Sequence, residues 1–110
     1  SLSGTRYGKM KIEQGDILKV KHQPYPVIVA SNNYFNETGK AIVCPVRKDV
    51  LPGPLHLPVD HDLVDGFILC EQFHYLDLKQ RTFSKIGMIP YYDVMDLSDA
   101  IMGIFDYQAI

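Results

Sequence analysis

Apolar and polar residues follow the spacing of β-strands over most of the chain. Short apolar runs either alternate with polar positions or stand as continuous blocks, and turn-forming residues separate them. Alternation predicts strands with one solvated face, and the continuous blocks predict strands buried on both faces. The segments that fit these patterns are 15–21, 27–30, 40–46, 55–59, 67–70, 71–76 and 84–89.

Glycine and proline mark the turns between these segments. The turn at 36–39 ends in Gly39, which is free to take a positive φ, so residues 26–46 are expected to form a β-hairpin. Pro58 interrupts one segment, which suits a strand at the edge of a sheet. The other expected breaks are a loop at 47–54, a turn at 65–66 and one helical turn at 77–81.

The last segment changes to the spacing of a helix. Apolar residues recur there every three or four positions on one face, and acidic residues take the opposite face. Pro90 stands where a helix can begin. The apolar positions are Val94, Leu97, Ile101, Ile104 and Phe105, and the acidic positions are Asp93, Asp96 and Asp99.

These elements predict one α+β domain over residues 10–110. Its expected form is a small antiparallel SH3-like β-barrel with a C-terminal helix packed on it. The 110 residues are enough for a single core but not for two. Residues 1–9 differ in character from the rest, and we expect them to be a segment added by cloning or a disordered one.

Composition and charge limit the classes of partner only mildly. No apolar run approaches the roughly 20 residues that span a bilayer, so a cytoplasmic protein without membrane contact is expected. The formal net charge of −2 counts mildly against nucleic acid, because phosphate binding depends on Lys and Arg. Cys44 and Cys70 lie within apolar runs and are expected to be buried, reduced thiols. The four histidines form no i, i+4 pair, so no metal site is expected.

Five short blocks occur in order along the chain, each an apolar run that meets polar residues. Together with the terminal helix they resemble the MazF/PemK family of toxins over about residues 10–107. The blocks are 15–17 (Gly-Asp-Ile), 26–33 (Pro-Val-Ile-Val-Ala-Ser-Asn-Asn), 41–46 (Ala-Ile-Val-Cys-Pro-Val), 66–72 (Gly-Phe-Ile-Leu-Cys-Glu-Gln) and 84–87 (Ser-Lys-Ile-Gly).

The resemblance implies a fold, an activity and partners. Proteins of this family are the toxin components of type II toxin–antitoxin systems and have the same barrel-and-helix architecture. They cut single-stranded mRNA without a metal or other cofactor and leave a 2′,3′-cyclic phosphate. They act as homodimers, and a disordered segment of an antitoxin protein blocks them.

Cleavage of this kind needs a base for the 2′-hydroxyl, a cation for the phosphate and an acid for the leaving oxygen. Where the family carries an arginine before the second strand, this chain has Tyr25, and where the family carries a threonine or serine after the next strand, it has Arg47. We expect these two residues to exchange roles across one cleft; the alternative is a decayed site with two ordinary surface groups. Glu71 matches an acidic position of the family, and His22 lies in the loop that borders the RNA cleft there, so both are candidate proton-transfer groups.

Other polar residues are candidates for binding RNA. Each also has a structural explanation, since Ser and Asn satisfy turn backbones and a lone histidine is often a structural group. The candidates are Lys21, Ser31, Asn32, Lys48, His56 and His74.

Two other functions are consistent with the same sequence. One is a catalytically weak or inactive relative that acts as a protein-binding module. The other is inhibition of gyrase, as by the CcdB-like relatives of this barrel, although the blocks follow the ribonuclease branch more closely.

Overall fold

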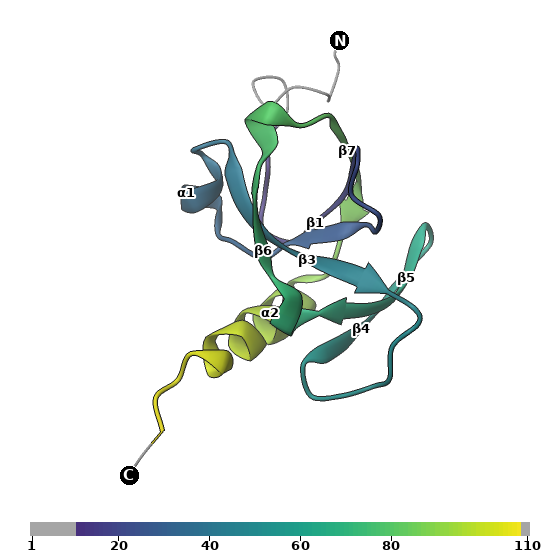
Figure 1. Cartoon of the computed structure of the whole chain (residues 1–110), viewed down its shortest axis with the longest axis vertical. Coiled ribbons are helices and arrows are strands. Elements are labelled where there is room, and N and C mark those ends of the chain that lie inside the picture. The colour runs from purple at the N-terminus through teal and green to yellow at the C-terminus, as the bar shows by residue number, and fades with distance from the viewer. Residues whose placement is uncertain (1–10, 109–110) are drawn as a thin grey trace.

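Seven strands form one curled antiparallel sheet in residues 11–108, the part of the chain that this computed structural model describes (Figure 1). The segment 1–9 lies outside the described residues. The strands run in the order β4-β5-β3-β2-β1-β7, and β6 pairs with β3. The sheet is a half-barrel with a C-terminal helix, as expected. The strands are β1 (Asp16–Val20), β2 (Val27–Val29), β3 (Lys40–Arg47), β4 (His56–His61), β5 (Val64–Leu69), β6 (His74–Asp77) and β7 (Phe83–Met88).

The long strand β3 gives the sheet its curl because two different strands share one of its edges. Its first half pairs with β6, from Lys40 opposite Asp77 onward, and its end pairs with β5, with Arg47 opposite Phe67. Its other edge pairs with β2, so the hairpin expected over 26–46 is confirmed. A short helix α1 (Asn33–Asn36) precedes the turn of that hairpin. The positive φ of 85° at Gly39 agrees with the turn expected there.

Alternation along the strands divides the core between two faces of the sheet. Leu18 of β1 and Val27 of β2 point into the curl, where the short helix η3 (Leu78–Gln80) and β7 cover them. Ile17 and Ile28 point to the other face, where the β4–β5 hairpin and the helix α2 (Tyr91–Ile104) cover them. Pro58 lies in β4, which is an edge strand, as its proline predicts.

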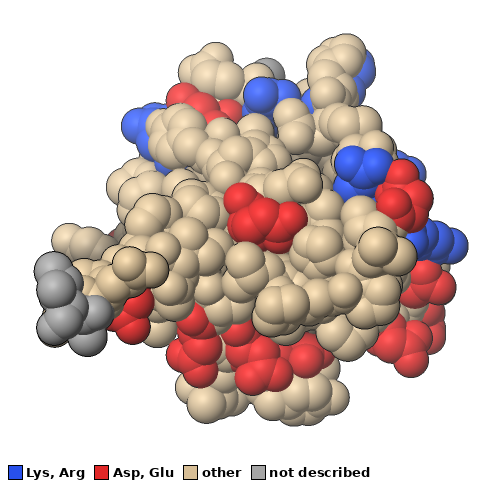
Figure 2. Space-filling view, turned by 60° about the horizontal axis from the view of Figure 1, so that its bottom comes forward, with Lys and Arg blue, Asp and Glu red and all other residues tan. Residues whose placement is uncertain are grey.

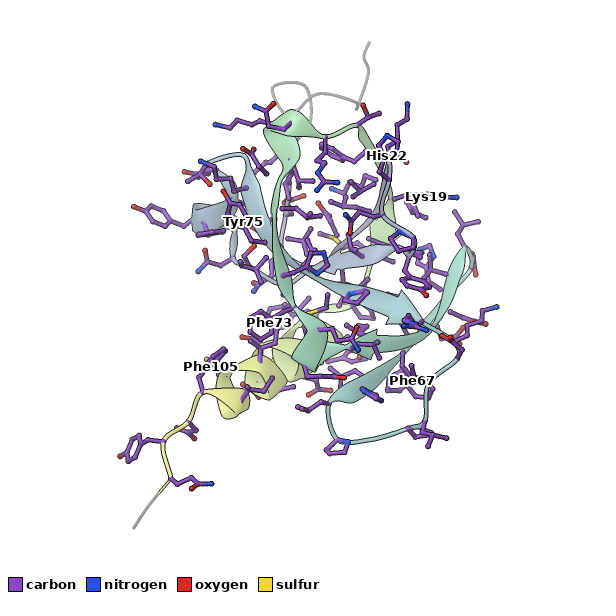
Figure 3. The ribbon with its side chains drawn as sticks, viewed as in Figure 1. Lys19, His22, Phe67, Phe73, Tyr75 and Phe105 are labelled. Carbon is purple, nitrogen blue, oxygen red and sulfur yellow. The ribbon has the colours of Figure 1, made fainter. Side chains whose placement is uncertain are left out.

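The C-terminal helix α2 packs on the core as far as Ala100 and Ile101, and its last residues project beyond it. Val94 and Leu97 are buried, whereas Ile104 and Phe105 are 39% and 68% exposed. The ring of Phe105 contacts that of Phe73 edge to face, with 5.5 Å between the ring centres (Figure 3). The apolar face of this helix is therefore longer than the surface it packs on, and its C-terminal end is exposed among the described residues.

Two details of the sequence-based prediction are wrong. Residues 65–66 do not form a turn: β5 already begins at Val64, and Asp65 pairs with Asp60 of β4. Residues 70–72 are not a strand but the 3₁₀ helix η2 (Cys70–Gln72), so Glu71 does not lie on a strand. Both errors come from a local signal, a glycine or an apolar run, that the tertiary context overrode.

An ion pair between a buried aspartate and a half-buried lysine connects the first and last of the five sequence blocks. Asp16 is fully buried, and one of its oxygens, Oδ2, accepts a hydrogen bond from the backbone N–H of Glu13 at 2.7 Å. Nζ of Lys85 lies 3.0 Å from Oδ1 of Asp16. Burial raises the pKa of Asp16, and the hydrogen bonds from Glu13 and Lys85 oppose that rise. These residues of the first and last blocks therefore join β1 to β7.

Candidate active site

A pocket of about 500 Å³ opens where the ends of three segments meet. Its lining comes from residues 25–26 before β2, residues 46–49 at the end of β3, and residues 61–65 at the tip of the β4–β5 hairpin. We call it the Arg47 pocket. It contains both positions at which the sequence departs from the family pattern.

The strand register brings Tyr25 and Arg47 together. Val27 of β2 pairs with Pro45 of β3, and continuing that register by two residues places Tyr25 opposite Arg47 on the same face. The guanidinium carbon of Arg47 lies 4.6 Å from the centre of the Tyr25 ring. This is a cation–π contact, which holds the cation against the pocket wall.

Both cations of the pocket form ion pairs with carboxylates. Nε and Nη2 of Arg47 donate to the two oxygens of Asp49 at 2.9 and 2.6 Å, and Nζ of Lys48 lies 3.4 Å from Asp65. The hydrogen bonds from Arg47 hold the pKa of Asp49 below its usual value. The lining carries two cations against three carboxylates, the third being Asp62. Three of the five N–H donors of Arg47 are not used by Asp49 and can bind an anion.

Glu71 does not reach this pocket. Its Oε2 lies 3.1 Å from Nε2 of His56, and Nδ1 of the same ring lies 2.6 Å from the carbonyl oxygen of Leu51. His56 is the first residue of β4, and His61, which lines the pocket, is the last. The two residues are therefore about 17 Å apart along an extended strand, and Glu71 lies at the His56 end. Both ring nitrogens of His56 have partners, so neither is free to exchange a proton with a substrate.

His22 and Lys21 lie in the turn between β1 and β2. The backbone N–H of Gln23 donates to Val20 at 3.0 Å, and His22 has a φ of 72°, which describes a type II turn. Both side chains are exposed, and His22 lies at the rim of the half-barrel in Figure 3. His74 of β6 contacts this turn through Nε2, which lies 3.3 Å from Oε1 of Gln23.

Ser31 and Asn32 hold the backbone around α1. Oδ1 of Asn32 accepts from the N–H of Phe35 at 2.9 Å as the N-cap of that helix. The hydroxyl of Ser31 donates to Oδ1 of Asn36 at 2.5 Å and accepts from the N–H of Ile42 at 2.9 Å. The Ser31 hydroxyl and the Asn32 amide oxygen therefore already have partners within the chain.

Among the polar residues of the Arg47 pocket, Asp49, His61 and Asp62 are absent from the candidates drawn from the sequence. Nδ1 of His61 accepts from the N–H of Leu63 at 3.1 Å, so the neutral ring carries its proton on Nε2. A Cβ added at Gly87 would collide with this ring, so the glycine leaves room for His61 in its present position. No sequence signal identifies His61 and Asp62, because only the fold brings the hairpin tip to the end of β3, whereas the pairing of Asp49 with Arg47 depends on the conformation of the loop after β3.

No group of three or more His, Cys, Asp or Glu side chains is arranged to hold a metal ion within residues 11–108. In the same range no helix is long and apolar enough to cross a membrane. Acidic side chains gather along the lower rim of the face shown in Figure 2, and basic side chains lie toward its upper edge.

Comparison with known proteins gives one family and several structures. The family described as "PemK-like, MazF-like toxin of type II toxin-antitoxin system" matches residues 13–105. A chain in the crystal structure of MazE–MazF from Deinococcus radiodurans superposes with a TM-score of 0.80 at 18% identity, covering 88% of this chain and 98% of that one. MazF alone from the same organism gives 0.77 at 18%, with coverages of 88% and 98%.

An endoribonuclease in complex with its cognate antitoxin from a mycobacterial species gives a TM-score of 0.73 at 12% identity, covering 86% of this chain and 94% of that one. At sequence identities this low, the TM-scores establish a shared fold and nothing further. No curated protein sequence matches the chain significantly.

Proposed function

The chain belongs to the PemK-like, MazF-like toxins of type II toxin–antitoxin systems, and we propose that it is a metal-independent endoribonuclease that cuts single-stranded mRNA at the Arg47 pocket. The observation that carries this proposal is the contact between Tyr25 and Arg47. In this contact a cation and a hydroxyl group, the two kinds of group that the family carries at neighbouring strand ends, lie in one pocket of about 500 Å³, although the hydroxyl here is a phenol.

In the proposed reaction the 2′-oxygen attacks the adjacent phosphorus and the bond from phosphorus to the 5′-oxygen breaks. The free N–H groups of Arg47 bind the non-bridging oxygens as charge develops on them. The Tyr25 hydroxyl supplies the proton to the leaving oxygen. Asp62 takes the proton of the 2′-hydroxyl, because it lines the pocket and has no ion-pair partner among the described residues. The products are a 2′,3′-cyclic phosphate and a free 5′-hydroxyl.

The catalytic roles proposed for Glu71 and His22 stay predictions, and so do the RNA contacts of Lys21, Lys48, Ser31, Asn32, His56 and His74. Glu71 and His56 lie at the far end of β4 from the pocket, so their contact with RNA would be at another nucleotide. An RNA strand that crosses the turn between β1 and β2 would meet Lys21, His22 and His74 together.

One observation favours the second candidate function, a catalytically inactive binding module. Asp49 holds Arg47 through two hydrogen bonds, and carboxylates outnumber cations in the pocket lining. A phosphate must displace or share Arg47 with that carboxylate, which weakens binding of a polyanion.

Cleavage of a long RNA in the absence of divalent metal separates the two functions. Primer extension maps new ends, and an RNA with single 2′-deoxy linkages tests the need for the 2′-hydroxyl. We expect discrete cuts that fall at least 100-fold in Arg47→Ala and Tyr25→Phe, in line with the loss of a transition-state donor. Lys40→Ala is the matched control, because Lys40 lies at the other end of β3. Intact RNA at high protein excess, or cuts that persist in Arg47→Ala, would contradict the proposal.

Partners are also proposed from the relatives. The solved relatives include complexes of MazF with MazE and of an endoribonuclease with its cognate antitoxin. We propose that this chain likewise binds an antitoxin segment and forms a homodimer. The exposed apolar end of α2 supports an interface of this kind, since exposed apolar patches mark interaction sites.

A further inference from the structure

The loop 48–55 connects the Arg47 pocket to β4 and has little burial of its own. It leaves β3 directly after Arg47 and carries Lys48 and Asp49, which line the pocket. Residues 51–54 are exposed, and Leu51 is 83% exposed. Because few apolar contacts hold this loop, its conformation depends on its hydrogen bonds.

His56 supplies the hydrogen bonds that fix the loop to the rest of the domain. Its Nδ1 lies 2.6 Å from the carbonyl oxygen of Leu51, and its backbone N–H donates to Gly53 at 3.1 Å. Its Nε2 lies 3.1 Å from Oε2 of Glu71 in η2. That short helix is itself anchored, because Cys70 is fully buried and its N–H donates to Leu55 at 2.9 Å. The ring therefore bridges an exposed loop and a fixed element.

Both hydrogen-bond partners of the His56 ring are acceptors, which favours the doubly protonated imidazolium. A carbonyl oxygen and a carboxylate oxygen can only receive a proton in a hydrogen bond. Neutral imidazole has one N–H and can make one of these bonds, whereas imidazolium has two and makes both. Glu71 of η2 is the only charged group among the described residues that acts on the ring. Asp49 of the loop pairs with Arg47, Lys48 of the loop pairs with Asp65 of β5, and no acidic residue in the described part of α2 contacts the ring.

We infer that His56 is a positioning residue: as the imidazolium it holds loop 48–55, and through it Asp49 and Arg47, in the geometry of the pocket, and the loop loosens when the ring loses its proton. The step from the loop to RNA cleavage rests on the proposed function. The ordering of the loop does not.

The expected pH window follows from the two groups. Acceptance of its proton by the Leu51 carbonyl, and then by Glu71, raises the pKa of His56 above its usual value near 6.5. Burial would raise the pKa of Glu71, but the hydrogen bonds from His56, from the Glu71 backbone and from Gln72, together with the charge of His56, outweigh burial and lower this pKa from its usual value of 4.5. The contribution of His56 to loop stability is complete below pH 6.5 and is lost as pH rises through its raised pKa. The contribution of Glu71 is complete above pH 4.5 and is lost as pH falls through its lowered pKa.

Amide hydrogen exchange of His56 and Cys70, whose N–H groups donate to Gly53 and Leu55 of the loop, tests the inference when it is measured by NMR between pH 5.5 and 8.5 and corrected for intrinsic rates. We expect protection in the loop to fall roughly fivefold as the His56 ring titrates, the ratio that corresponds to one net hydrogen bond. In Glu71→Gln the midpoint of both the ring titration and the loop exchange should move to lower pH together. His22→Asn, which changes an exposed histidine outside this loop, should leave both unchanged. Loop protection that stays flat while His56 titrates would overturn the inference.

The pH dependence of RNA cleavage is a second measurement, and it would not change if His56 only stabilised the fold. If the inference holds, the alkaline limb of the pH–rate profile follows the His56 midpoint and shifts with it in Glu71→Gln. A limb that does not move in Glu71→Gln would overturn the link from loop to pocket. A wild-type protein that cuts no RNA but shows the loop transition would refute the proposed function and leave the positioning role intact.

Discussion

At the scale of single residues, the position of Arg47 depends on a glycine in the neighbouring strand. Gly66 of β5 has a φ of 132°, and a Cβ there would lie 2.6 Å from the carbonyl oxygen of Arg47 and 3.2 Å from the nitrogen of Lys48. These are backbone atoms that cannot rotate away. The glycine thus lets β5 approach the pocket residues closely, which explains its place within a strand.

Gly66→Ala should therefore lower the free energy of unfolding by about 2 kcal/mol or more, because it combines an unfavourable φ with a backbone collision. Urea unfolding measures the loss. Gly103→Ala in α2 is the control, since no heavy atom lies within 4 Å of its added Cβ. In that helix, alanine should stabilise the protein by about 0.5 kcal/mol. Equal stabilities of the two variants would contradict the close-approach explanation.

At the scale of elements, the strands and α2 were predictable because their apolar periodicity reflects what they bury. The alternation of Ile17 and Leu18 between the two faces of the sheet is visible in the sequence. The meeting of Tyr25 and Arg47 was expected from family resemblance, and the register of β2 and β3 explains it physically. The pairing of Asp49 with Arg47 and the arrival of His61 at the pocket depend on a loop conformation and on where a hairpin tip folds, and neither is a local property of the chain.

Two lysines that have no ion-pair partner among the described residues lie near the pocket, Lys19 in β1 and Lys21 in the turn after it. Lys19 and Lys21 are exposed and have no ion-pair partner among residues 11–108, unlike Arg47 and Lys48. The register of β1 and β2 places Lys19 beside Pro26 of the pocket, and in Figure 3 Lys19 points outward from the sheet. We expect these two lysines to bind the RNA backbone.

Lys19→Ala with Lys21→Ala should reduce the slope of log K against log salt by about 1.4 for a non-cleavable single-stranded oligonucleotide, since each lost phosphate contact removes about 0.7. Fluorescence anisotropy at several salt concentrations measures it. Lys40→Ala with Lys79→Ala makes the same charge change at the other end of β3, about 24 Å from Arg47, and should leave the slope unchanged. The same slope change in both double variants would show a general effect of charge and refute the proposal that the RNA backbone binds along Lys19 and Lys21.

At the scale of the whole molecule, the distribution of exposed apolar side chains is uneven. They concentrate on α2 and the residues after it, including Met102, Phe105 and Tyr107 at 60%, 68% and 90% exposure. The acidic residues of the same helix occupy its other face. A second copy of the chain is the partner that we propose for this end of the helix.

Light scattering of the purified chain at micromolar concentration should give the mass of a dimer. Met102→Glu with Phe105→Glu should shift it to the mass of a monomer, because the interface would then bury two unpaired charges. Gln80→Glu with Thr82→Glu adds the same charge on exposed positions away from α2 and should leave the dimer intact. A wild-type protein with the mass of a monomer would contradict the proposed interface.

The reactivity of the two buried cysteines measures how often the folded state opens, without any assay of activity. Both are fully buried, and burial raises the pKa of Cys44 to about 12 and that of Cys70 to about 11. A thiol reagent at neutral pH therefore modifies them only in molecules that have opened. Any partner that binds the closed form slows this labelling in proportion to its occupancy. The rate of alkylation would thus report binding of an antitoxin segment or of a second copy, even in a variant that cuts no RNA.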